Sequence, residues 1–111
     1  MATVHITEQM YDLLWEAMTE EILDSVGEEM VSIDREIILE EDTYLRLQVR
    51  LMLFWDTWEE PEGRYHRLAD LIPTWWELES CLPDRDGEPE EFPNDANFKE
   101  LRNKAYDYYA F

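Results

Sequence analysis

The sequence predicts a single α+β domain over residues 1–111, with an N-terminal helix, an antiparallel sheet of three or four strands and a C-terminal helix. Apolar residues recur at three- and four-residue steps at both ends of the chain and at two-residue steps through its middle. A chain of 111 residues allows one hydrophobic core and hardly a second. The order helix, strands, helix is typical of helices packed against one face of an antiparallel sheet.

The N-terminal helix is predicted to begin after Thr7 and to end before Gly27. Thr7 has a side chain suited to an N-cap, and Glu8 is favoured in the first turn by the helix dipole. Gly27 tolerates the left-handed conformation that often follows a helix. The residues at helical spacing are Met10, Tyr11, Leu14, Trp15, Met18, Ile22, Leu23 and Val26. We expect this apolar face to pack on the sheet.

The middle of the chain predicts a β-hairpin. Apolar and polar residues alternate from 31 to 40 and again from 45 to 53, as in strands with one buried face. Residues 41–43 between them have the composition of a turn. Arg35 breaks the alternation of the first strand, so we expect a bulge near it.

Charged residues on the two strands are expected to meet across the hairpin. Arg46 and Arg50 share one parity on the second strand, and Asp34 and Glu36 share one parity on the first. Opposite charges at such cross-strand positions are favourable. Beyond residue 51 the second strand is apolar on both parities, which favours a place inside the sheet.

The next part of the chain is harder to interpret. Residues 64–72 fit either a short helix or a third strand, and Pro73 is expected to end either one. Alternation around Trp76 and Leu78 predicts a last strand, and residues 83–93 read as an acidic loop.

The C-terminal helix is predicted to begin at a cap formed by Asn94 or Asp95. Phe98, Leu101 and Ala105 then follow at helical spacing. More apolar surface follows than one helix face can bury, which makes a homodimer an alternative to a monomer. The residues that supply this surface are Tyr106, Tyr108, Tyr109 and Phe111.

Charge excludes some classes of function. The 28 Asp and Glu residues outnumber 9 Lys and Arg, which gives a net charge of -19. Direct nucleic-acid binding through phosphate contacts needs clustered cations and is not expected. No apolar run is long enough to span a membrane, and the N-terminus lacks the pattern of a signal peptide. Cys81 is the only cysteine, so we expect a reducing, cytoplasmic environment.

Five carboxylates at four-residue steps form a stripe on the predicted N-terminal helix, about 6 Å apart along its axis. Such a row would attract a basic surface over long range. We therefore expect a non-enzymatic protein that binds a basic protein, as an inhibitor, an immunity-type protein or a nucleic-acid mimic. The residues of this acidic stripe are Glu8, Asp12, Glu16, Glu20 and Asp24.

Two other functions remain open. Trp75 and Trp76 must point to opposite faces of a strand, and an exposed tryptophan near Glu77 and Glu79 would suit a small cationic or sugar ligand. The same two glutamates could act as the carboxylate pair of an enzyme, although no catalytic motif accompanies them. No catalytic residue, cofactor or metal ligand set is predicted from the spacing of the two histidines and Cys81.

Overall fold

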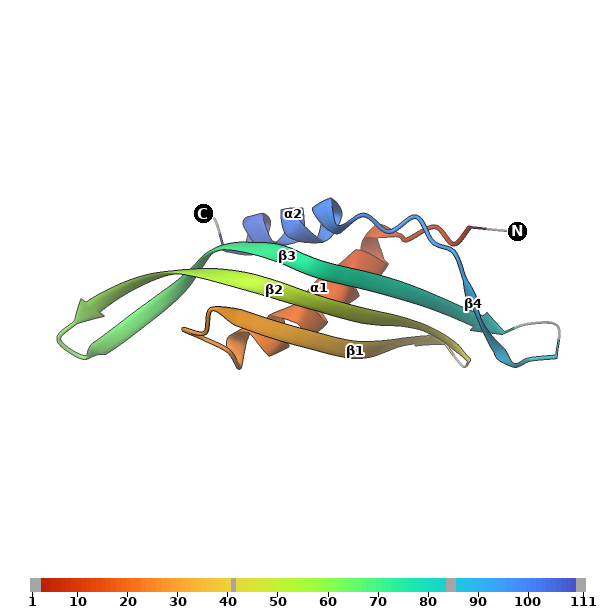
Figure 1. Ribbon diagram of the computed structural model, residues 1–111, viewed down its shortest axis with the longest axis horizontal. Coiled ribbons are helices and arrows are strands. Elements are labelled where there is room, and N and C mark those ends of the chain that lie inside the picture. The colour runs from red at the N-terminus through yellow and green to blue at the C-terminus, as the bar shows by residue number, and fades with distance from the viewer. Residues whose placement is uncertain (1–2, 41, 84–85, 110–111) are drawn as a thin grey trace.

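The computed structural model describes residues 3–40, 42–83 and 86–109 and confirms the α+β layout (Figure 1). Four strands form one sheet in the order β1-β2-β3-β4, and each neighbouring pair is antiparallel. Both helices lie on one side of the sheet (Figure 1). The elements are α1 (Glu8–Leu23), β1 (Met30–Glu40), β2 (Thr43–Glu60), β3 (Gly63–Pro83), β4 (Pro89–Phe92) and α2 (Phe98–Tyr109).

Helix α1 begins as the sequence predicts and ends earlier. The Thr7 side chain accepts a hydrogen bond of 3.2 Å from the backbone N–H of Met10, so Thr7 is the N-cap. The C-cap is Asp24, and Val26 is exposed rather than part of the core face. Gly27 has a φ of 85° and lies in the turn beyond the cap.

The predicted hairpin forms, but its bulge is elsewhere. Strands β1 and β2 pair regularly through Arg35, and the register shifts between Ile38 and Glu40. Arg35 keeps its place in the ladder because it faces α1, where its guanidinium binds Glu20 at 2.9 Å and Glu21 at 3.1 Å. A long side chain that reaches carboxylates does not need a bulge to leave the core.

Residues 64–72 form a strand, and Pro73 does not end it. Strand β3 runs through Pro73, and Leu51 pairs with Pro73 while Arg50 pairs with Trp75. Thr74 is therefore an extra residue, as in a β-bulge. Because β4 pairs with β3 from Ser80 to Pro83, Pro73 lies on a part of β3 with no strand on its other side, and proline is tolerated at the edge of a sheet.

The connection from β3 to α2 also differs from the prediction. Strand β4 lies within the segment that reads as a loop, and α2 is capped by Asn97, whose side chain accepts from the N–H of Lys99 at 2.9 Å. Asn94 instead donates to the carbonyl of Leu78 at 2.8 Å. Asp95 accepts from the N–H of Ile6 at 2.7 Å. These two residues anchor the chain before α2 rather than capping it.

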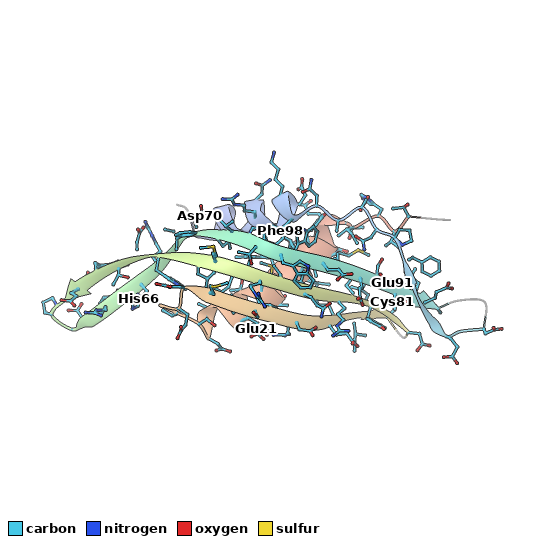
Figure 2. All side chains as sticks on the ribbon, viewed as in Figure 1. Glu21, His66, Asp70, Cys81, Glu91 and Phe98 are labelled. Atoms are coloured by element: carbon cyan, nitrogen blue, oxygen red, sulfur yellow. The ribbon has the colours of Figure 1, made fainter. Side chains whose placement is uncertain are left out.

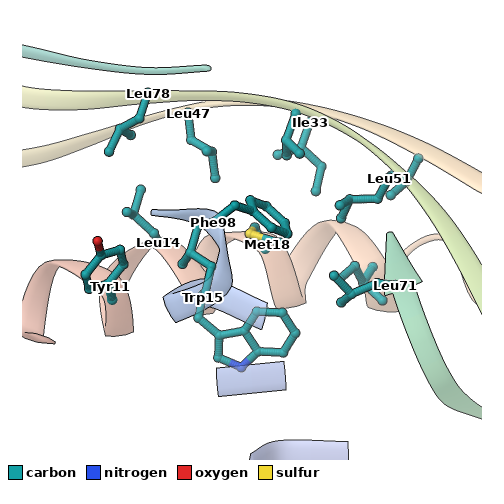
Figure 3. Packing of buried hydrophobic residues seen from close by; sticks show 14 of the residues in the cluster. Tyr11, Leu14, Trp15, Met18, Ile33, Leu47, Leu51, Leu71, Leu78 and Phe98 are labelled. Carbon is teal, nitrogen blue, oxygen red and sulfur yellow. The ribbon is translucent and has the colours of Figure 1, made fainter. Parts of the chain in front are cut away.

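The core lies between the sheet and the helices (Figure 3). Leu14 and Met18 of α1 point toward the inward side chains of the sheet, and Phe98 of α2 closes the space beside them (Figure 3). Its ring lies 5.4 Å from the ring of Trp76. Side chains with almost no exposed surface include Leu14, Met18, Ile22, Leu45, Leu47, Val49, Leu51, Leu71 and Leu101.

Strands β2 and β3 are much longer than a typical strand of about 5–6 residues, and the molecule measures 61 × 22 × 20 Å. Pairing with β1 ends at Met52, so residues 54–70 form a two-stranded ribbon that projects past the helices (Figure 1). We call this segment the hairpin arm. It carries His66, at the far end of the molecule from Glu91 (Figure 2).

Candidate functional site

The acidic stripe is present on α1, and part of it is neutralised within the chain. The Lys104 ammonium of α2 lies 2.8 Å from a carboxylate oxygen of Asp12 and 3.2 Å from one of Glu8. These two hydrogen bonds, the one to Asp12 first, raise the pKa of Lys104 above its usual range. The sequence did not predict this contact, because it joins residues almost a full chain length apart.

The other end of the stripe is held by Arg35. Its ion pair with Glu20, together with that to Glu21, raises the pKa of the guanidinium. Glu16 is exposed, and Asp24 is exposed at the C-cap. Within the described part of the chain, Glu16 and Asp24 are the stripe carboxylates for which the structure shows no ion pair.

The structure places the two tryptophans of the predicted ligand pocket on opposite faces of the sheet. Trp76 packs inward against Phe98, whereas Trp75 is 52% exposed on the face of the sheet opposite the helices. Trp75 lines a shallow hollow of about 200 Å³ together with Asp34, Gln48 and Arg50. Ligand pockets for drug-sized molecules are usually about 300–1,000 Å³, so this hollow would hold only a small group.

A cluster of three carboxylates lies on the same open face. Oxygen atoms of Glu77, Glu79 and Glu91 all come within 4.8 Å of one another. Alternation along one strand predicts the pairing of the first two. Glu91 was missed because it lies on β4, in a segment that reads as a loop, and only the pairing of β4 with β3 brings it alongside.

Next to this cluster, a bidentate ion pair confirms the predicted cross-strand contact. Arg46 donates to both carboxylate oxygens of Asp34, at 3.1 and 2.9 Å. This hydrogen bond is the main reason that the pKa of Asp34 is lowered. Arg50 pairs across from Ser32 and not from a carboxylate.

A polar pocket of about 480 Å³ lies where the N-terminal segment meets the start of α2. The His5 Nδ1 atom is 2.7 Å from one oxygen of Asp95, and the other oxygen accepts from the N–H of Ile6. The Tyr11 hydroxyl accepts from the N–H of Asn97 at 3.1 Å. The bond from Ile6, followed by that from His5, lowers the pKa of Asp95. Asp95 thus links the N-terminal segment to the chain that leads into α2.

Replacing Asp95 by asparagine is expected to lower the melting temperature at neutral pH. Because the pKa of Asp95 is lowered in the folded state, its stabilising effect is fully present above its unfolded pKa and disappears as the pH falls through the folded value. The difference in melting temperature between wild type and Asp95→Asn should thus be present at neutral pH and shrink below about pH 4. Calorimetric melting at each pH measures it.

Glu90→Gln is the matched control, since it removes one exposed carboxylate from β4. It should show no such step in the acid range. If the two variants behave alike, the bonds from Ile6 and His5 do not stabilise the folded state.

None of the known protein families, curated proteins or solved structures compared with this chain matches it. In the part of the chain that the structure describes, neither helix has the length and apolar character to cross a bilayer. The functional argument therefore depends on the surface of the molecule itself.

Proposed function

We propose that this protein is a non-enzymatic binding protein whose acidic surface engages a basic surface of another protein. Most of its cations are already used within the chain. The sequence has nine Lys and Arg residues, and six of those that the structure describes form ion pairs with carboxylates of this molecule. They are Arg35, Arg46, Arg64, Arg67, Arg102 and Lys104. The large excess of carboxylates is left without a counter-charge, and this observation carries the proposal.

The excess of carboxylates indicates what kind of partner this surface would attract. A surface with strong negative potential accelerates association with a positive surface and repels other acidic surfaces. Inhibition of a basic enzyme, an immunity-type role and mimicry of nucleic acid are three forms of this function. Glu16 and Asp24 are the stripe residues best placed for contact, because their carboxylates lack an ion pair among the described residues.

The first experiment is capture from a lysate of the native host at low ionic strength, with elution in salt steps and mass spectrometry. A single basic protein that elutes in one step would support the proposal and provide the purified partner. A diffuse mixture of basic proteins would indicate that the charge serves solubility instead.

With that partner, the double variant Glu16→Lys/Asp24→Lys is expected to weaken binding by roughly 10-fold or more at low salt. The stripe loses its two free carboxylates, while the ion pairs of Lys104 and Arg35 stay in place. Titration calorimetry at two salt concentrations measures the change, which should shrink as salt screens the charges.

Glu62→Lys/Glu90→Lys is the control with the same change of net charge, since both residues are exposed and lie away from α1. Equal weakening by both variants would mean that net charge alone drives binding. In that case the stripe on α1 is not the contact surface.

A further inference from the structure

The open face of the sheet carries an apolar patch at the end nearest the hairpin arm. Strand pairing puts Met30, Met52 and Ile72 in one row across three strands. Because side chains alternate between the two faces of a strand, Trp58 of β2 and Tyr65 of β3 lie on this same face of the hairpin arm. Their rings stack at 5.9 Å. The patch consists of Met30, Met52, Phe54, Trp58, Tyr65, Ile72 and Trp75, each between 39% and 52% exposed.

This patch is large for a monomeric protein. A large side chain has about 150–250 Å² of surface, so seven of them at these exposures present roughly 600 Å². Each partner in a standard protein interface buries about 800 Å² in total, polar rim included. From Arg50 to Trp58 the patch extends about 27 Å along β2. It thus approaches the area that one side of a stable interface requires.

The charge of the patch distinguishes it from the rest of the surface. On this face of β2 and β3, the charged side chains within its limits are Arg50, Asp56 and Arg67, and the last two form an ion pair at 3.1 Å. A protein with a charge of -19 repels its own copies almost everywhere. At this patch two copies can meet with less repulsion than elsewhere, although Glu60 borders it and accepts a hydrogen bond from the Trp58 indole at 3.3 Å.

The hairpin arm is held by the rest of its own chain only near its base, where the Trp55 indole donates to the carbonyl of Glu28 at 2.7 Å and Leu68 is buried in the core. Beyond Met52 the ribbon has two strands and no β1 neighbour, and isolated two-stranded ribbons are marginally stable in water. One side of the arm carries the exposed rings of Phe54, Trp58 and Tyr65. Covering that side would bury aromatic surface and stabilise the arm.

We propose that the apolar patch is the interface of a homodimer, in which a second copy of this chain packs its open sheet face against the first. A two-fold arrangement places the same patch on both sides of the contact. Both α1 helices then face outward, far from each other, and their acidic stripes stay accessible. The proposal does not depend on the basic partner.

A basic partner of different sequence is the competing occupant, and the charge of the patch argues against it. Such a partner would be attracted to the carboxylates of Glu77, Glu79 and Glu91 at the other end of the face. The aromatic C-terminal residues that favoured a homodimer from sequence have side chains outside the described part of the structure. The patch is therefore an independent reason for dimerisation.

The test is sedimentation equilibrium of the full chain from about 1 to 100 µM, in about 0.15 M and 0.5 M salt. We expect the dimer mass at high concentration and a tighter dimer at the higher salt, because screening reduces repulsion between copies. Ile72→Thr should raise the dissociation constant at least about 10-fold, since it removes apolar surface from both sides of a symmetric contact.

Ile38→Thr is the matched control. Ile38 is 74% exposed on the same face of the sheet but lies outside the patch, at the opposite end of β1. The same substitution there should leave the dissociation constant unchanged. Equal effects of the two variants would overturn the proposal.

Hydrogen exchange of the wild-type protein provides a measurement that needs no variant. Backbone amides of the hairpin arm should exchange more slowly at about 100 µM than at about 1 µM, because the dimer covers the arm. A monomer mass at every concentration and salt, with unchanged exchange in the arm, would overturn the proposal. A monomer in which Ile72→Thr weakens binding of the captured basic protein would also overturn it and assign the patch to that partner.

Discussion

Replacing Leu14 by alanine is expected to lower the free energy of unfolding by about 3–4 kcal/mol, which corresponds to a fall in melting temperature of roughly 12–20 °C. Leu14 has no exposed surface and lies between the sheet and the helices (Figure 3). Removing its side chain loses the buried apolar surface and leaves a cavity that the strands of a continuous sheet close only in part. Urea unfolding followed by tryptophan fluorescence measures the change.

Leu13→Ala is the matched control, because the two leucines are neighbours on α1 and receive the same substitution. Leu13 is 41% exposed, so the change should cost less than about 1 kcal/mol. Losses of equal size at both positions would mean that α1 presents a different face to the sheet. The acidic stripe, which lies on the opposite face, would then also be misplaced.

Local patterns were enough to predict α1 and the first hairpin. The spacing of apolar residues in α1 and the side chain of Thr7 are signals within a few residues. The structure confirms the cap and the buried face as far as Ile22, whereas Leu23 and Val26 are exposed. The pairing of Arg46 with Asp34 followed from alternation on two consecutive strands. Such contacts are predictable because a short turn fixes the register of the strands that it joins.

Strand β3 was not predictable by the same reasoning. Its inward residues include Leu68, Leu71, Trp76 and Leu78, which change parity twice. Each change occurs where an extra residue enters the strand, between residues 68 and 70 and again at Thr74. A bulge breaks two-residue alternation, so the segment before Pro73 resembles a short helix as much as a strand.

The candidate site was predicted only in part, because the ion pairs that neutralise part of the acidic stripe join residues far apart in the sequence. Lys104 reaches Asp12 from α2, and Arg35 reaches Glu20 from β1. Each contact depends on how helices and strands are placed around the core, which no short pattern encodes. The apolar patch likewise becomes visible only when three strands are aligned, since its row of Met30, Met52 and Ile72 comes from distant segments.

Trp76→Ala is expected to destabilise the protein by about 3 kcal/mol or more, because the indole packs against the core and contacts the ring of Phe98. Trp75→Ala should change the free energy of unfolding by less than about 1 kcal/mol, since Trp75 is half exposed on the open face. The two tryptophans are consecutive and receive the same substitution. Thermal melting at about 1 µM, a concentration at which we expect the monomer, compares them directly.

The same pair of variants separates function from stability. Trp75→Ala should raise the dissociation constant of the dimer while the melting temperature at low concentration stays near that of wild type. If the open face instead binds a small amine or sugar, such a ligand should raise the wild-type melting temperature and lose this effect in Trp75→Ala. If Trp75→Ala is as destabilising as Trp76→Ala, part of this chain covers the open face. Neither the homodimer nor the ligand site could then use it.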